Sequence, residues 1–236
     1  MHALYPRMKI GGFQRNSLVD YPGKTAAVVY TQGCQWRCPF CHSRSLVFPT
    51  RFQPAIPVDE VIDQLLLRHD QIDGVVITGG EPTLQPGLPD FLREVKTIGL
   101  PAKLATNGAA PDVLSALLQE GLLGYVAMDV KGPLHDYALF VGGPVDTGPI
   151  ELSIEIIKRS SIPYEFRTTL VGGLHRPGHI EQLAPLVYGA RRYVLQSFRA
   201  VPGDDRVNGQ FSAPDAELFQ TASLALRDKV GEFMIR

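Results

Sequence analysis

The sequence of 236 residues lacks several features that would place it in a specialised class of protein. It has no excess of charge, since 23 basic residues stand against 24 acidic ones, and a general nucleic-acid binder needs a basic surplus to neutralise phosphates. It also lacks the apolar run of about 18–20 residues that a membrane span requires. Its first residues lack the apolar stretch of a secretory signal, so we expect a cytoplasmic protein that binds neither nucleic acid nor membranes.

Cysteine is scarce and is confined to one short segment. Cys34, Cys38 and Cys41 are the only cysteines of the sequence. An odd number of cysteines packed this closely is a poor disulfide framework for a chain of this size. The spacing C-x3-C-x2-C instead brings three thiolates onto one compact loop, where they could converge on one metal centre.

Two kinds of metal centre are compatible with three clustered cysteines. A structural zinc site needs four protein ligands, and His42 could supply the fourth, although its position next to Cys41 strains a tetrahedral cage. A [4Fe–4S] cluster usually takes four cysteines, so three would leave one iron open for another molecule. We expect the cluster, and a non-catalytic zinc-binding module remains the alternative.

Short apolar runs typical of buried parallel strands alternate along the chain with helical patterns. The strand-like runs are Thr25–Thr31, Gly74–Thr78, Ala102–Thr106, Tyr125–Val130, Tyr164–Leu170 and Tyr193–Phe198. Helical patterns, with apolar residues at a period of about 3.6, begin at Val58, Leu88, Val113, Ile154 and Ile180, and a last one follows Ser212.

This alternation predicts an α/β fold with a parallel sheet and right-handed crossovers. Six strand–helix units suit the length of the chain, because a full eightfold barrel needs about 250 residues. We therefore predict a partial (β/α)6 TIM-like barrel with parallel strands, formed by one domain over residues 9–236. A short N-terminal hairpin is expected around Lys9–Gly23, and residues 1–8 are expected to be an N-terminal extension.

Polar residues follow the predicted strands at their carboxyl ends, where parallel α/β sheets carry their chemistry. The second strand runs into Gly79, Gly80 and Glu81, whose carbonyls and carboxylate could receive an ammonium group. The third runs into Thr106 and Asn107, which would also suit a plain Asn-Gly turn.

The next strands also end in charged residues. Alternation places Asp129 and Lys131 on one face, so a role toward a ligand competes with a simple ion pair. Arg167 could pair with a carboxylate, and it shares its strand face with Glu165 and Thr169. Weaker candidates for the site, which ordinary structural or solvent contacts would explain equally well, are His175, Gln196 and Arg199.

The segment Cys34-Gln-Trp-Arg-Cys38-Pro-Phe40-Cys41 resembles the signature of the radical S-adenosylmethionine (SAM) enzymes. The resemblance implies a [4Fe–4S] cluster on the three cysteines, with the amino and carboxylate groups of SAM on the open iron. It implies that Phe40 packs near the adenine and that Gly79-Gly80-Glu81 binds the amino group of SAM. It assigns no side chain as a general acid or base.

Two other strand ends resemble the activating enzymes of glycyl-radical proteins. Thr106 and Asn107 stand where these activases often read Asp-Thr-Asn-Gly, but Ala105 replaces the Asp, which puts that one carboxylate contact in doubt. Asp129-x-Lys131 resembles their Asp-x-Lys, in which the lysine meets the SAM carboxylate and the aspartate lies near the ribose or a cation.

The segment Met8–Lys24, together with the motifs above and Glu165–Thr169, resembles the anaerobic ribonucleoside-triphosphate reductase activating proteins. This resemblance implies an oxidoreductase that cleaves SAM reductively to a 5′-deoxyadenosyl radical. The radical would then take a hydrogen atom from a glycine of the partner reductase. The electron would come from a flavodoxin- or ferredoxin-type donor. The alternative is a radical SAM enzyme acting on a small molecule, similar to 7-carboxy-7-deazaguanine synthase.

Overall fold

The computed structural model of the protein describes residues 8–200 and 203–236. Residues 1–7 of the expected N-terminal extension lie outside the described part of the chain. Met8, which the sequence placed in that extension, is buried in the hydrophobic core.

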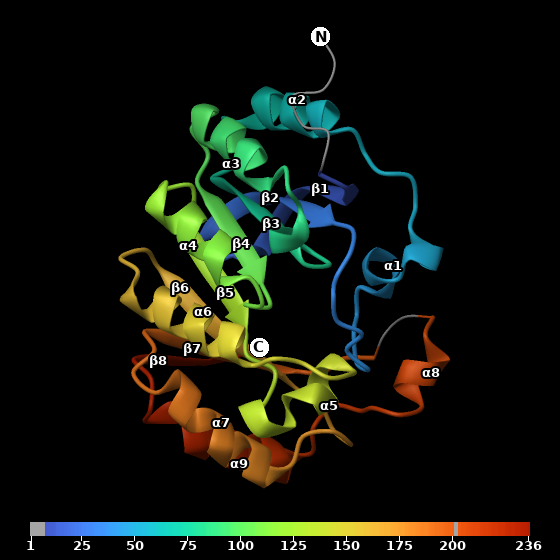
Figure 1. Ribbon diagram of the computed structural model, residues 1–236, viewed down its shortest axis with the longest axis vertical. Coiled ribbons are helices and arrows are strands. Elements are labelled where there is room, and N and C mark those ends of the chain that lie inside the picture. The colour runs from blue at the N-terminus through green and yellow to red at the C-terminus, as the bar shows by residue number, and fades with distance from the viewer. Residues whose placement is uncertain (1–7, 201–202) are drawn as a thin grey trace.

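Within the described residues, eight strands form one sheet in the order of the chain (Figure 1). The strands are β1 (Ile10–Tyr21), β2 (Lys24–Thr31), β3 (Gly74–Gly79), β4 (Ala102–Thr106), β5 (Tyr125–Asp129), β6 (Tyr164–Leu170), β7 (Arg192–Ser197) and β8 (Glu232–Ile235). All neighbouring pairs are parallel except β1 and β2, which are antiparallel. Strands β2 to β7 are the six predicted from the apolar runs.

The N-terminal hairpin and the last strand refine this prediction. The hairpin consists of β1 and β2 joined at Gly23, which has a φ of +70°, so its second arm is the first predicted strand rather than part of Lys9–Gly23. Strand β8 adds a seventh parallel strand that the sequence analysis did not anticipate. Its four residues are too few to display a periodic pattern.

The longer helices follow the strands and correspond to the predicted helical patterns. They are α2 (Val58–Arg68), α3 (Leu88–Thr97), α4 (Pro111–Gln119), α6 (Gly148–Arg159), α7 (Pro177–Val187) and α9 (Ala216–Arg227). Shorter helices lie in the loops, namely α1 (Arg44–Val47), α5 (Tyr137–Val141) and α8 (Asp205–Asn208). Single-turn 3₁₀ segments cover Pro49–Arg51, Pro82–Leu84 and Leu134–Asp136.

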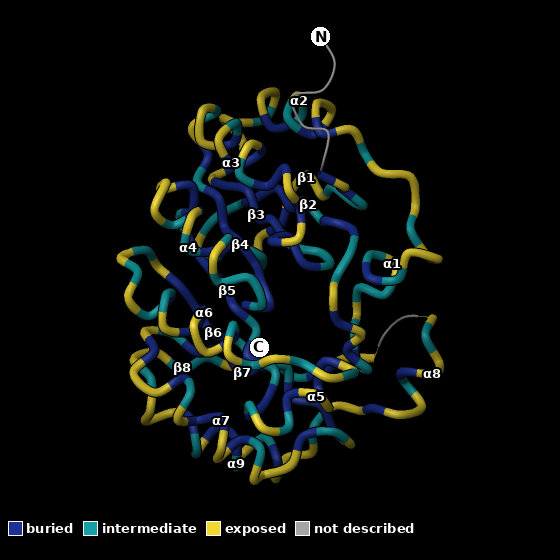
Figure 2. The backbone as a smooth tube through the Cα atoms, viewed as in Figure 1, coloured by how far each residue is buried: buried dark blue, intermediate teal, exposed yellow. Residues whose placement is uncertain are grey.

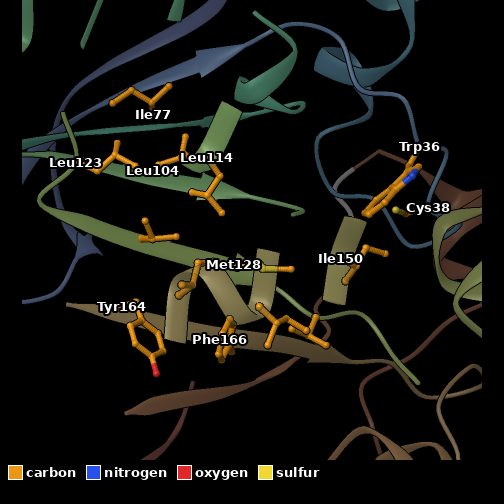
Figure 3. Packing of buried hydrophobic residues seen from close by; sticks show 14 of the residues in the cluster. Trp36, Cys38, Ile77, Leu104, Leu114, Leu123, Met128, Ile150, Tyr164 and Phe166 are labelled. Atoms are coloured by element: carbon orange, nitrogen blue, oxygen red, sulfur yellow. The ribbon is translucent and has the colours of Figure 1, made fainter. Parts of the chain in front are cut away.

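The main hydrophobic core lies between the sheet and the helices that cover its outer face (Figure 2). In α3, for example, Leu88, Phe91, Leu92 and Val95 are all fully buried, because they recur on one face of the helix. Figure 3 shows Ile77, Leu104 and Met128 packed in this layer, with Trp36 and Cys38 near Ile150 at its edge.

The inner face of the sheet carries a smaller apolar cluster and a buried ion pair. The apolar cluster contains Tyr21, Ala26, Val28, Val76, Tyr125 and Ala127. Beside it, Lys103 Nζ lies 3.1 Å from Glu165 Oε1, and both side chains are almost inaccessible to solvent. Glu165 also accepts a hydrogen bond from the Tyr125 hydroxyl at 3.2 Å. A buried charge pair is tolerated only when it is well partnered, and this one is.

The sheet does not close into a barrel. Among the described residues no ladder joins β1 to β8, so the architecture is the partial barrel that the sequence predicted. The carboxyl ends of the parallel strands β2 to β6 meet on one side of this open sheet. In the same described ranges, no helix combines the length and the apolar character needed to cross a membrane.

Candidate active site

The cysteine segment is a loop that follows β2 and is tied to the rest of the fold by backbone hydrogen bonds. Gly33 N donates to Leu46 O at 2.7 Å, and Arg37 N donates to Val141 O at 2.9 Å. Within the loop, Arg37 Nη1 donates to the carbonyl oxygen of Cys34 at 2.6 Å. These contacts hold an otherwise irregular segment in one conformation.

Cys34, Cys38 and Cys41 line one pocket of about 210 Å³ and form no disulfide. Burial raises the pKa of all three thiols above its usual range. Cysteine binds a metal as the thiolate, so a positively charged centre in this pocket would favour the deprotonated form. Three thiols that face one pocket fit a [4Fe–4S] cluster with one iron left open.

The zinc alternative has weaker support from the geometry. Nε2 of His42, the residue considered as a fourth ligand, donates to Arg199 O at 2.8 Å, and the ring lies 5.1 Å from that of Phe198. Across residues 8–200 and 203–236, no three His, Cys, Asp or Glu side chains stand close enough together to hold a single ion. The thiols of a cubane cluster stand further apart, because each binds a different iron.

Two glycines allow the end of β3 to lie directly against the start of the cysteine loop. Gly79 has a φ of +115°, and a Cβ atom there would lie 2.4 Å from Thr31 N. A Cβ atom on Gly80 would lie 2.0 Å from Gly33 O. Only glycine permits this approach, which is sealed by hydrogen bonds of 2.8 Å from Gly80 N to Thr31 O and from Glu81 N to Gly33 O.

Glu81 is a buried carboxylate that joins two strand ends. Its Oε1 accepts hydrogen bonds from Thr83 N, Thr83 Oγ1 and Thr106 Oγ1 at 3.1, 2.6 and 2.7 Å. Its Oε2 accepts from Asn107 N at 2.7 Å. Burial raises the pKa of Glu81 even though these four donors favour its charged form. The carboxylate therefore fixes the loops after β3 and β4 relative to each other.

Asn107 connects this network to the cysteines. Its side-chain Oδ1 accepts from Gln35 Nε2 at 3.3 Å and from Ala109 N at 3.0 Å, while its Nδ2 lies 3.9 Å from Cys34 Sγ. The hydrogen bond from Ala109 N to Asn107 Oδ1 closes the local turn that the Asn-Gly pair predicted. The same side chain also contacts the cysteine loop, through Gln35 and Cys34.

Asp129, Lys131 and Arg167 form a charged cluster in the wall of the pocket at β5 and β6. Nε and Nη2 of Arg167 each lie 2.8 Å from Asp129 Oδ1, and Lys131 Nζ lies 3.5 Å from Asp129 Oδ2. Burial raises the pKa of Asp129, but the charges of Arg167 and Lys131 outweigh burial, so the pKa is lowered. Two cations against one carboxylate leave this wall with a positive excess that suits an anionic ligand group.

The pocket brings together every residue that the sequence analysis singled out as a probable ligand contact. These residues are Cys34, Cys38, Phe40, Cys41, Gly79, Gly80, Glu81, Thr106, Asn107, Asp129, Lys131 and Arg167. Thr169 also lines it, as its shared face with Arg167 suggested. The roles assigned to these residues remain predictions.

Glu165 and the three weaker candidates lie outside the lining of this pocket. Glu165 belongs to the buried pair with Lys103, away from the lining of the pocket. His175 is 4% exposed: its Nδ1 accepts from Val171 N at 3.1 Å and its Nε2 donates to Lys131 O at 3.0 Å. Gln196 and Arg199 are also absent from the pocket lining.

Some lining residues were missed from the sequence. They are Trp36, Ser43, Val47 and Thr78, while His42 was considered only for zinc and Ala105 only as the replacement of an aspartate. Trp36 packs edge-on against Tyr137, with ring centroids 5.8 Å apart. The position of Trp36 between Cys34 and Cys38 in the sequence could have identified it as a lining residue. Ala105 lines the pocket at the position where activases often carry an aspartate, and its methyl group supplies no charge there. The carboxylates among the lining residues are those of Glu81 and Asp129.

Two curated proteins that are similar in sequence to this chain are both named as activating enzymes. A glycyl-radical enzyme activating enzyme of Methanocaldococcus jannaschii is 34% identical over 80% of this chain and 79% of its own length. A pyruvate formate-lyase-activating enzyme of Staphylococcus aureus is 35% identical over 40% of this chain and 39% of its own length.

A solved structure also shares the fold. SuiB of Streptococcus suis, solved bound to S-adenosylmethionine, matches 89% of this chain with a TM-score of 0.66 and 14% identity. This chain spans about half of SuiB, 49% of its length. The family model of the radical SAM superfamily matches residues 28–184, which include the cysteine motif and most of the pocket. The chain therefore belongs to the radical SAM superfamily, whose cofactors are a [4Fe–4S] cluster and SAM.

Proposed function

We propose that this protein is a glycyl-radical enzyme activating enzyme and that its partner is an anaerobic ribonucleoside-triphosphate reductase. The observation that carries the activase proposal is the long alignment with the Methanocaldococcus protein of that description, at 34% identity. The shorter alignment with a pyruvate formate-lyase-activating enzyme supports the same class. The choice of the reductase as partner rests on the resemblance of the Met8–Lys24 segment.

The three cysteines would hold the cluster. When bound, the cluster and SAM together supply a 5′-deoxyadenosyl radical, made by one-electron cleavage of the bond between sulfur and C5′. The protein's own contribution is to position these groups and to exclude water. The tight contact between the Gly79–Gly80 segment and the start of the cysteine loop serves both purposes, because it closes one wall without side chains.

The other lining residues suit the parts of SAM. The carbonyls after β3 would accept the ammonium group, and the four bonds to Glu81 hold this backbone in place. Lys131 would meet the carboxylate, since it lies on the wall with excess positive charge. Asp129 and Asn107 would lie near the ribose, and Phe40, which is 6% exposed, would pack on the adenine.

The partner's glycine must reach the interior of the same pocket, because the radical forms there. We infer that a loop of the partner carries this glycine into the pocket, on the side of the open sheet where the parallel strands end. The cytoplasm remains the predicted compartment, since three cysteines without a disulfide suit reducing conditions.

The test is an anaerobic incubation of the cluster-loaded protein with SAM, dithionite and the candidate reductase. We expect 5′-deoxyadenosine and a glycyl-radical doublet in the electron paramagnetic resonance spectrum of the partner. A partner variant with Ala in place of the target glycine is the control, and it should give no doublet.

Two results would reject parts of the proposal. A modified small molecule, with no radical on any partner protein, would favour a small-molecule enzyme similar to 7-carboxy-7-deazaguanine synthase. A radical on a different glycyl-radical enzyme, but not on the nucleotide reductase, would keep the activase and reject the partner.

A further inference from the structure

The cysteine loop has two faces with different chemistry. Cys34, Trp36, Cys38, Phe40 and Cys41 line the SAM pocket on one face. Arg37 and Pro39, which alternate with them, instead line a second pocket of about 250 Å³ on the other face. Only the thickness of the loop therefore separates the second pocket from the cysteines.

Arginines dominate the second face. Arg37, Arg44 and Arg51 surround Phe48, with guanidinium carbons 5.2, 4.6 and 6.0 Å from the centre of its ring. Arg206 of α8 joins Arg37 and Arg44 in the lining of the second pocket, whereas Arg51 reaches the same cluster only through Phe48. We call Arg37, Arg44, Phe48, Arg51 and Arg206 the arginine surface. Figure 1 shows α1 and α8, which carry two of these arginines, beside the loop that follows β2.

The arginine surface keeps an excess of positive charge after its internal ion pairs are considered. Asp204 neutralises part of it, since its Oδ2 lies 2.9 Å from Arg44 Nε and 3.6 Å from Arg51 Nη1. Asp205 is exposed next to it. Four arginines thus face two aspartates, whereas the whole chain has 23 basic and 24 acidic residues. The excess is local and faces solvent, because Arg37, Arg51 and Arg206 are exposed.

We propose that the arginine surface is the docking site of an acidic one-electron donor protein, such as a flavodoxin. This inference rests on the proposed function, which requires one electron from outside the chain for each SAM cleaved. The donor loses one electron, the cluster gains it, and cleavage of the sulfur–C5′ bond consumes it to yield methionine and the deoxyadenosyl radical. Charge complementarity favours carboxylates on the partner, because planar guanidiniums bind them with specific geometry.

The position of the arginine surface also explains how two protein partners could be accommodated. The glycyl-radical partner must enter the SAM pocket, which lies on the inner face of the cysteine loop. A donor on the outer face approaches the same cysteines from the other side. The donor therefore does not need to leave before the substrate protein binds.

Arg51→Glu and Arg206→Glu are the test variants. Both side chains are exposed, whereas Arg37 holds the Cys34 carbonyl and Arg44 is half-buried in its ion pair with Asp204. Arg159→Glu is the matched control, because this exposed arginine of α6 lies outside both pockets and its substitution makes the same change in net charge.

The first measurement is the affinity of an oxidised acidic flavodoxin for the cluster-loaded protein, by calorimetry over a range of salt concentrations. We expect about tenfold weaker binding for each test variant and a smaller dependence on salt, with no change for Arg159→Glu. Equal affinity of wild type and both test variants, or an equal loss in the control, would overturn the proposal.

The second measurement compares SAM cleavage driven by reduced flavodoxin with cleavage driven by dithionite. The test variants should be slower by about tenfold with flavodoxin and within about twofold of wild type with dithionite. An equal loss with both reductants would overturn the docking role. If the wild type produced no deoxyadenosine with dithionite, the proposed function would fail, while the binding measurement would still test the docking site.

Discussion

Acidification should weaken the fold through one buried histidine. His175 lies in the loop after β6, where its Nδ1 accepts from Val171 N and its Nε2 donates to Lys131 O. These two bonds require the neutral ring with its proton on Nε2, because a proton on Nδ1 would oppose the Val171 N–H. Burial lowers the pKa of His175 from 6.5 to about 4.

The size of the effect follows from this difference in pKa. Between pH 6.5 and 4 the unfolded chain binds a proton at this position and the folded chain does not. The stability that depends on neutral His175 is therefore present above pH 6.5 and decreases as the pH falls. We expect the free energy of unfolding to decrease by about 2 kcal/mol between pH 7 and pH 5. Burial also lowers the pKa of His179, which adds to the same slope.

Urea unfolding of the cluster-free protein at pH 7, 6 and 5, followed by circular dichroism, measures this slope. His175→Asn keeps an acceptor for Val171 N–H but cannot titrate, so it should be less stable at pH 7 and show a flatter profile. His69→Asn, the same substitution at an exposed position, should keep the stability of wild type at pH 7. A His175→Asn profile as steep as that of wild type would refute the reasoning.

Other perturbations address the pocket and the inner face of the sheet. Glu81→Gln places an amide N–H against one of the groups that now donate hydrogen bonds to the carboxylate. We therefore expect the free energy of unfolding, measured with urea, to fall by about 2–4 kcal/mol, against about 0.5 kcal/mol or less for Glu181→Gln at an exposed position. Lys131→Met should weaken SAM binding at least about tenfold by equilibrium dialysis, and exposed Lys229→Met should not; unchanged affinity would make Lys131 purely structural. Cys38→Ala should remove the iron and the formation of deoxyadenosine while preserving the circular dichroism spectrum, so a loaded and active variant would contradict the ligand assignment. Burial raises the pKa of Glu165, but Lys103, Arg167 and Arg236 together lower it further, so the linked stability is lost as the pH falls below the usual carboxyl range of about 4; Glu165→Gln should flatten unfolding profiles in that range.

The strands that could be predicted are those whose apolar runs are long enough to show a pattern. Strands β2 to β7 and the helices between them were visible because burial on both faces of a parallel sheet demands continuous apolar runs. Strand β8 and the single-turn helices α1, α5 and α8 gave no such signal. Elements of four or five residues form because tertiary contacts hold them, not because of periodicity.

The candidate site shows the same division. The cysteine spacing and the residues after each strand determined which side chains would meet, because parallel strands deliver their carboxyl ends to one edge of a sheet. The sequence could not assign Glu165 and His175. Glu165 lies two residues from the pocket-lining Arg167 on the same strand, yet it belongs to a buried ion pair. His175 follows that strand in a loop and holds the loop to the carbonyl oxygen of Lys131.

The amino-acid sequence by itself determined the chemistry of this protein: three thiols on one loop, two glycines at the next strand end, and an aspartate and lysine two residues apart. Each of these motifs consists of residues close together in the sequence, so it can be recognised without knowledge of the fold. Only the tertiary structure decided that Glu81 is held by four donors, that Arg167 reaches Asp129, and that arginines from three separate segments gather behind the cysteines. Such groupings depend on how distant segments pack, and no spacing along the chain encodes them.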